Sequence, residues 1–154
     1  MRIMLLLVAS LLAACLAPAG SAGADSPIQA TRAWARASPS GGGPVAVYLT
    51  LRDRGRADRL TSVTADAAGM VMIHQSTQQN GVSEMRELQS VGLPARGTVV
   101  FRPGALHVML MDLNRTLRPG DTFSLVLTFD HAPPVTVKVP VLPPGSPGPG
   151  PAAP

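Results

Sequence analysis

Cysteine is nearly missing from this sequence. The 154 residues include one Cys, Cys15, which lies near the N-terminus. The rest of the chain therefore has no thiol for a disulfide, a thiolate zinc site, a thioredoxin-like redox reaction or a cysteine nucleophile. The same lack excludes an ordinary blue-copper centre, which needs a Cys thiolate beside two His.

Charged and aromatic residues are also scarce. Charged residues make up 14% of the chain and aromatic residues 3%, and the net charge of +4 is spread without a Lys/Arg run. Nucleic-acid-binding proteins normally combine a basic patch with stacking aromatics. We therefore expect no nucleic-acid partner. No motif for an activated nucleophile occurs either, and we do not expect an enzyme.

Residues 1–24 are predicted to be an export signal. A positive start is followed by an apolar stretch over residues 3–14, and residues 21–24 end in a small-x-small cleavage pattern. A second interpretation stays open, because residues 12–15 resemble a bacterial lipobox in which Cys15 would be lipidated. Both place the protein outside the cytoplasmic membrane, either in the periplasm or lipid-anchored at the outer face of a bacterial membrane. No other segment is long and apolar enough to span a bilayer.

Residues 25–142 are predicted to form a single all-β domain. Short runs rich in β-formers alternate with Gly, Pro and Asn turn signals, and no window has a helical period of useful length. Regular short strands of this kind are typical of an antiparallel sandwich or barrel. The predicted strands are residues 45–51, 60–63, 71–76, 82–88, 98–101, 106–113, 122–129 and 135–141.

Residues 143–154 consist of Pro, Gly, Ala and Ser. Such a composition cannot bury a core, so we expect a disordered tail.

Methionine and histidine gather in one part of the chain. Five of the seven Met and two of the three His lie between residues 70 and 111. Side chains of a strand alternate between its two faces, so Met70, Met72 and His74 should point away from Val71 and Ile73. Residues 106–111 repeat the arrangement. There the apolar face is Leu106, Val108 and Leu110, and the opposite face is His107, Met109 and Met111.

The Asn80-Gly81 step predicts how the first of these strands turns back. Asn-Gly favours a two-residue type I′ hairpin. Counting from that loop places His74 opposite Glu87 and makes Met85 its diagonal neighbour on the same face, within reach of long side chains. A slip of one residue would move Met85 to the other face.

Thioether sulfur suits Cu(I), and imidazole binds several transition metals including copper. We predict two pairs of neutral, soft metal ligands, His74 with Met85 and His107 with Met109, since Zn²⁺, Ca²⁺ and Mg²⁺ prefer harder or anionic ligands. Neither the alternation nor the turn shows that the two pairs meet in one site. A single Met or His more often serves packing. We therefore assign no ligand role to the nearby or more distant candidates Met70, Met72, Glu84, Glu87, Met111 and His131.

The four predicted ligands also match a known motif of His, ten residues, Met, twenty-one residues, His, one residue and Met. With its flanking segments, the chain resembles the periplasmic copper chaperone PCu(A)C family from about residue 28 to residue 141. The flanking similarity lies in residues 33–37, 46–51, 81–86, 103–110 and 117–121.

This resemblance implies a cupredoxin-like Greek-key β-fold that binds one Cu(I) ion near its surface, in a monomer. The implied function is delivery of copper by ligand exchange. The acceptor would be the dinuclear copper centre in the copper-containing subunit of cytochrome c oxidase, or a thiol-containing assembly factor.

Three other functions stay open. The same site could serve periplasmic copper buffering or resistance. A cupredoxin-type electron carrier is disfavoured by the missing Cys ligand. A plain exported adhesion or scaffold domain would not bind Cu(I) stoichiometrically.

Overall fold

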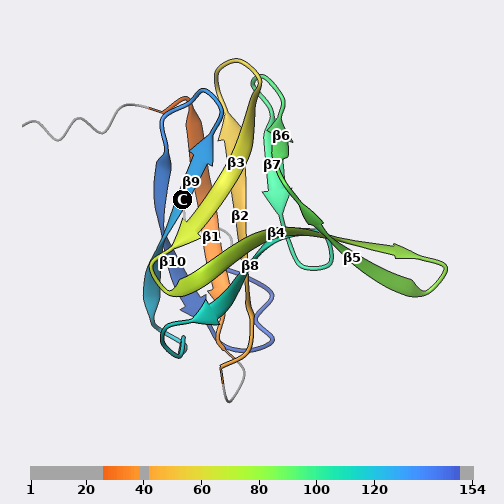
Figure 1. Ribbon diagram of the computed structural model, residues 1–154, viewed down its shortest axis with the longest axis vertical. Coiled ribbons are helices and arrows are strands. Elements are labelled where there is room, and N and C mark those ends of the chain that lie inside the picture. Colours follow the sequence, from red (N-terminus) through yellow and green to blue (C-terminus); the bar gives the residue numbers. More distant parts are fainter. Residues whose placement is uncertain (1–25, 39–41, 150–154) are drawn as a thin grey trace, which may run out of the picture.

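The computed structural model describes residues 26–38 and 42–149. These residues form ten β-strands (Figure 1) and include no helix long and apolar enough to cross a membrane. The predicted signal segment and Cys15 lie outside the described residues. The strands are β1 Ile28–Arg36, β2 Val45–Asp53, β3 Asp58–Ala65, β4 Ala68–Gln79, β5 Val82–Leu88, β6 Val91–Leu93, β7 Thr98–Phe101, β8 Leu106–Leu113, β9 Thr122–Phe129 and β10 Val135–Leu142.

The prediction of an all-β domain is confirmed, with the bounds of β5, β7, β8 and β9 as expected. Two strands were missed. β1 is interrupted by a register shift between Thr31 and Trp34, and Arg32 there has a φ of 52°. That irregularity breaks the two-residue alternation on which strand prediction rests. β6 has only three residues.

The strands follow the order β5-β4-β8-β2-β1-β10-β9-β3-β6, with β7 paired to β2. All pairs are antiparallel except β1 with β10, so the sheet is mixed rather than purely antiparallel as we predicted. Figure 1 shows the path folding into two layers, while β4 crosses the front and continues with β5 into a projecting hairpin.

The core lies between the two layers. Val47, Leu49 and Leu51 of β2 and Leu125 and Leu127 of β9 are at most 1% exposed. They belong to one buried apolar cluster that also includes residues of β3, β4, β8 and β10. Burial of a Val or Leu side chain stabilises a fold by about 1.5–3 kcal/mol. This cluster therefore makes the β2–β8 part of the sheet a firm base for side chains on its outer face.

The segment after β10 was expected to be a disordered tail, yet its described part, residues 143–149, contacts the domain. Arg36 donates two hydrogen bonds, each 3.2 Å, to the carbonyl oxygen of Ser146. Gly148 lies so close to Trp34 that a Cβ there would come within 3.2 Å of the indole. Because glycine has no side chain, the backbone of this Pro/Gly segment can lie directly against the indole ring of Trp34.

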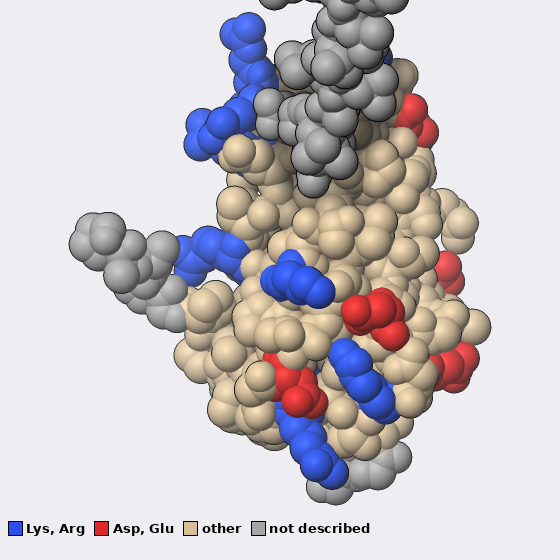
Figure 2. All heavy atoms as spheres, turned by 90° about the vertical axis from the view of Figure 1, so that its left-hand side faces the viewer, with Lys and Arg blue, Asp and Glu red and all other residues tan. Residues whose placement is uncertain are grey.

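The surface charges are interspersed on the face drawn in Figure 2. Lys and Arg side chains and Asp and Glu side chains both occur there, and the two kinds lie close together in the lower half of the view. Such a mixture produces no strong field of one sign over this face, and such fields are what steer charged macromolecules.

Asp58, at the start of β3, fastens the loop between β9 and β10. Its carboxylate accepts hydrogen bonds from the backbone N–H groups of Arg59, His131 and Ala132 and contacts Nδ1 of His131 at 3.2 Å. Burial alone would raise the pKa of Asp58, but these hydrogen bonds outweigh it and hold the pKa below its ordinary value. The ionised form therefore stabilises the fold.

Asp58→Ala should lower the free energy of unfolding by roughly 1.5–3 kcal/mol, because three backbone N–H donors lose a charged acceptor. Since the folded-state pKa is depressed, the Asp58 contribution is full above the unfolded-state pKa and is lost as pH falls through the folded-state pKa. Urea unfolding should show a wild-type advantage at pH 7 that shrinks below about pH 4.

Asp130→Ala is the control for this experiment. Asp130 faces Arg59 at 3.7 Å, with both side chains about half exposed or more, and such pairs contribute about 1 kcal/mol or less. Equal effects of the two substitutions would contradict the role assigned to Asp58.

Candidate metal centre

Strand β4 presents one apolar face and one soft-ligand face, as predicted. Ile73 is 5% exposed and belongs to the core cluster, and Val71 packs against that cluster. Met70, Met72 and His74 alternate with them and therefore lie on the outer face of the sheet. The alternation requires an unbroken register, and the pairing of β4 with β8 is continuous from Met70 to His74.

Strand β8 has the same division. Val108 and Leu110 are fully buried in the core, so His107 and Met109 lie on the outer face. His107 is nevertheless only 5% exposed. The aromatic ring of Tyr48, on the neighbouring strand β2, lies beside it.

The register between β4 and β8 joins the two halves of the predicted site. His74 lies directly opposite His107, and Met72 lies directly opposite Met109. The imidazole centroids are 5.7 Å apart with ring planes at 86°. Alternation along each strand predicts each half of the site separately, but the pairing of the halves depends on contacts between residues far apart in the sequence.

The fourth predicted residue comes from the projecting hairpin. Asn80 and Gly81 have φ values of 51° and 80°, as a type I′ loop requires. His74 lies opposite Glu87, so the predicted register is confirmed. Met85 pairs with Ser76, two residues along β4 from His74, which makes it the diagonal neighbour on the same face. Its side chain is 54% exposed.

Both imidazoles have a nitrogen atom that can bind a metal ion. Nδ1 of His107 lies 2.9 Å from the carbonyl oxygen of Ala105. A carbonyl only accepts, so we assign the proton of neutral His107 to Nδ1, which leaves the Nε2 lone pair free. Nδ1 of His74 is buried and has no hydrogen-bond partner among the described residues. An unpaired buried polar atom normally costs about 1–3 kcal/mol, so its presence calls for a ligand or another explanation.

Within the described ranges, no three His, Cys, Asp or Glu side chains are grouped to hold a metal ion. Thioether sulfur is the further donor type that this face offers beside the two imidazoles. That donor set is neutral and soft, and it suits Cu(I) better than hard divalent cations.

Tyr48 lies beside His107, and Trp34 in turn packs against Tyr48. The ring of Tyr48 on β2 lies 6.5 Å from that of His107, and Trp34 on β1 lies 4.6 Å from Tyr48. The guanidinium of Arg36 is within 5.8 Å of both aromatic ring centroids. Burial raises the pKa of the Tyr48 phenol, and the positive charge of Arg36 only partly offsets this. Tyr48 therefore stays neutral at physiological pH beside the metal-ligand candidates.

Comparison with known proteins decides the family. The LpqE-like family model, described as "Putative lipoprotein LpqE-like", matches residues 28–141. The chain belongs to this LpqE-like (PCu(A)C) family. It is also 31% identical over 116 residues to "Putative lipoprotein Lxx21020" of Leifsonia xyli, covering 74% of this chain and 69% of that protein.

Solved PCu(A)C structures share the fold. The copper-bound PCuAC domain from PmoF2 is 25% identical, with a TM-score of 0.65 over 77% of this chain and 94% of that domain. The solution structure of CuI-DR1885 from Deinococcus radiodurans is 28% identical, with a TM-score of 0.62 over 80% of this chain and 85% of that one. The resemblance inferred from sequence and the cupredoxin-like fold are thereby confirmed.

The remaining soft or ionisable candidates of this PCu(A)C chain fall into two groups. Glu87 faces the same side as His74, whereas His131 is bound to Asp58 at a different place in the fold.

Sequence reasoning assigned no role to Trp34 and Tyr48, although both lie in segments that resemble the family. Their stacking depends on the pairing of β1 with β2, which no local sequence signal specifies.

A substitution at Gly81, in the loop between β4 and β5, should destabilise strand β5, which carries Met85. Gly81→Val places a β-branched residue at positive φ, which costs roughly 1–2 kcal/mol. We expect amide hydrogen exchange in β5 to accelerate about 5–30-fold, with β9 unchanged. The control is Gly92→Val, because Gly92 has no positive φ and no neighbour within 4 Å of an added Cβ. Equal acceleration of β5 exchange in both variants would contradict this role.

Proposed function

We propose that this protein binds one Cu(I) ion tightly through His74, Met85, His107 and Met109 and carries it as cargo to an acceptor protein. The observation that carries the proposal is the pair of imidazoles of His74 and His107, which lie opposite each other. Nδ1 of His74 is buried and has no hydrogen-bond partner among the described residues. Thioethers lie on both sides of this pair, as the sheet register requires. The copper named in the titles of two solved relatives supports the same metal.

The charge state of the donors favours the monovalent ion. Two imidazoles and two thioethers bring no negative charge, and thioether sulfur prefers Cu(I) to harder ions. The mature domain has no thiolate, since Cys15 is the only Cys in the chain. A site of this kind holds copper less firmly than thiolate ligands do, as a carrier that must release its cargo requires.

Differences in exposure indicate the order of ligand exchange. Met85 is 54% exposed on the projecting hairpin, whereas His107 is 5% exposed and backed by Tyr48. An incoming Cys or His of the acceptor would reach copper from the Met85 side. We propose that Met85 is replaced first and that His107, held at Nδ1 by the Ala105 carbonyl, leaves last.

The acceptor we propose is the dinuclear copper centre of cytochrome c oxidase or a thiol-containing assembly factor. The support is the family to which the chain belongs. Deletion of the gene should reduce oxidase activity at low copper, and added copper should restore it. Copper sensitivity with intact oxidase activity would favour buffering or resistance instead.

Competitive Cu(I) titration against a chromophoric chelator tests the metal site directly. His107→Ala and Met109→Ala should each weaken the tight site by about 100-fold or more, equivalent to about 2.8 kcal/mol. Met85→Leu should have a smaller effect, because the exposed thioether is the most easily replaced ligand.

His131→Ala is the matched control, since His131 is an exposed histidine bound to Asp58. It should leave the Cu(I) affinity unchanged. Unchanged affinity in the quadruple variant of His74, Met85, His107 and Met109 would overturn the proposed function.

We also propose that Cys15 is lipidated and anchors the mature protein at the outer face of a bacterial membrane. The family description and the name of the Leifsonia relative both contain the word lipoprotein, which supports the lipobox interpretation. On expression in a bacterium, the chain should partition into detergent, and Cys15→Ser should abolish this. A mature N-terminus at Asp25 in soluble periplasmic protein would instead establish simple cleavage.

A further inference from the structure

The outer face of β4 and β8 carries more sulfur than the predicted site uses. Met70 lies opposite Met111, and Met72 lies opposite Met109, in one unbroken register that ends at the pair of His74 and His107. We call the two methionine pairs the thioether ladder. Met109 belongs to the site already described, which leaves three thioethers without a role.

The spacing of the ladder places these sulfur atoms within reach of one ion. Directly opposite residues have Cβ atoms about 4.5–5.5 Å apart. Successive rows on one face of a strand lie about 7 Å apart, because each residue advances the chain by about 3.3–3.4 Å. Methionine is unbranched with three rotatable bonds, so neighbouring side chains can turn their sulfur atoms toward a shared position.

Exposure argues against a purely packing role. Met70 is 44% exposed, and it is one of four large hydrophobic residues that stand out as exposed in the described part of the chain. Met72 and Met111 are intermediate in burial. A methionine that fills a core gap is expected to be buried, whereas these residues line the outside of the sheet.

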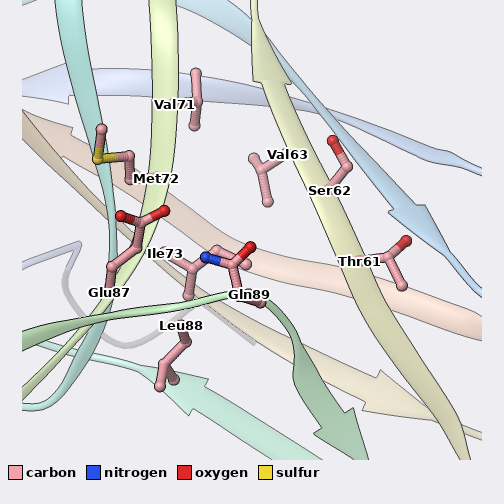
Figure 3. Close-up of a pocket in the computed structure, with 9 residues that line it drawn as sticks. All are labelled: Thr61, Ser62, Val63, Val71, Met72, Ile73, Glu87, Leu88 and Gln89. Atoms are coloured by element: carbon pink, nitrogen blue, oxygen red, sulfur yellow. The ribbon is translucent and has the colours of Figure 1, made fainter.

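A cavity of about 170 Å³ opens beside the ladder. Met72 and Glu87 both line it, and Figure 3 shows the Glu87 carboxylate beside the Met72 side chain. Glu87 also lies opposite His74 on the same face. A carboxylate at this opening attracts a cation to the thioethers.

We propose that Met70, Met72 and Met111 form a second, weaker site for a soft monovalent cation, next to the imidazole pair. Cu(I) would enter at the exposed Met70 end and move along the ladder to His74 and His107. The proposal rests on the proposed function, because the ladder leads to that site. The second site is weaker because it has thioethers and no imidazole.

The competing interpretation is an apolar surface that only docks a partner protein. Methionine-to-leucine substitution separates the two, since leucine preserves the apolar character and approximate volume while removing the sulfur. A docking surface would tolerate the substitution, but a soft-metal site would not.

Titration of the mature chain with Cu(I), and in parallel with Ag(I), tests the ladder. The wild type should bind a tight ion and a weaker second ion. The triple variant Met70→Leu, Met72→Leu, Met111→Leu should lose the second ion, while the first ion stays bound with its affinity changed by less than about tenfold, because leucine keeps the packing of Met72 against Met109. Urea unfolding of the triple variant checks that the fold is kept.

The reciprocal variant is His74→Ala with His107→Ala. It should lose the tight ion and retain one weakly bound ion whose X-ray absorption shows sulfur ligands only. Adding the three Leu substitutions to this variant should remove that ion.

The possible failures are distinguishable. A wild type that binds the tight ion alone, or a triple variant that still binds two ions, would overturn the second site and leave the proposed function standing. A wild type that binds no ion would overturn both.

Discussion

The antiparallel pairing of β4 with β8 is the interaction on which the metal centre depends. It places His74 against His107, and a slip of one residue would turn the outer face of either strand into the core. That slip is prevented from the opposite side of the sheet, where Ile73, Val108 and Leu110 are buried in the core cluster. The arrangement of the proposed ligands is thus set by apolar burial on the opposite face of the sheet.

The proposed site has a buried part, which includes His107, and an exposed part, which includes Met85. His107 sits on the sandwich, between core residues and the Tyr48–Trp34 stack, and is nearly fully buried. Met85 sits on a hairpin whose strand β5 is mostly exposed and, among the described strands, pairs with β4 alone. Strands with few buried contacts open locally at lower free energy than core strands. The β8 part of the proposed site can therefore preserve its geometry while the β5 hairpin opens locally.

The sequence predicts the local features of this arrangement but not the contacts between residues far apart in the chain. Alternation defines the two faces of β4 and β8, and the Asn80-Gly81 loop defines the register of the β4–β5 hairpin, because both are local effects. The meeting of β4 with β8 and the stack of Trp34 on Tyr48 join segments far apart in the chain. β1 was missed because its irregularity near Arg32 interrupts the pattern.

The outer face of this sheet departs from the ordinary rule that solvent-facing strand positions carry polar side chains. Met70 and Met85 are about half exposed, and His74 keeps a buried nitrogen without a partner. An exposed apolar side chain lowers solubility, and an unpaired buried polar atom costs stability. Such local conflicts between sequence and fold are expected at functional sites. The soft cation proposed above would remove these conflicts together, because it would bind the outer-face sulfur atoms and the His74 nitrogen that has no partner among the described residues.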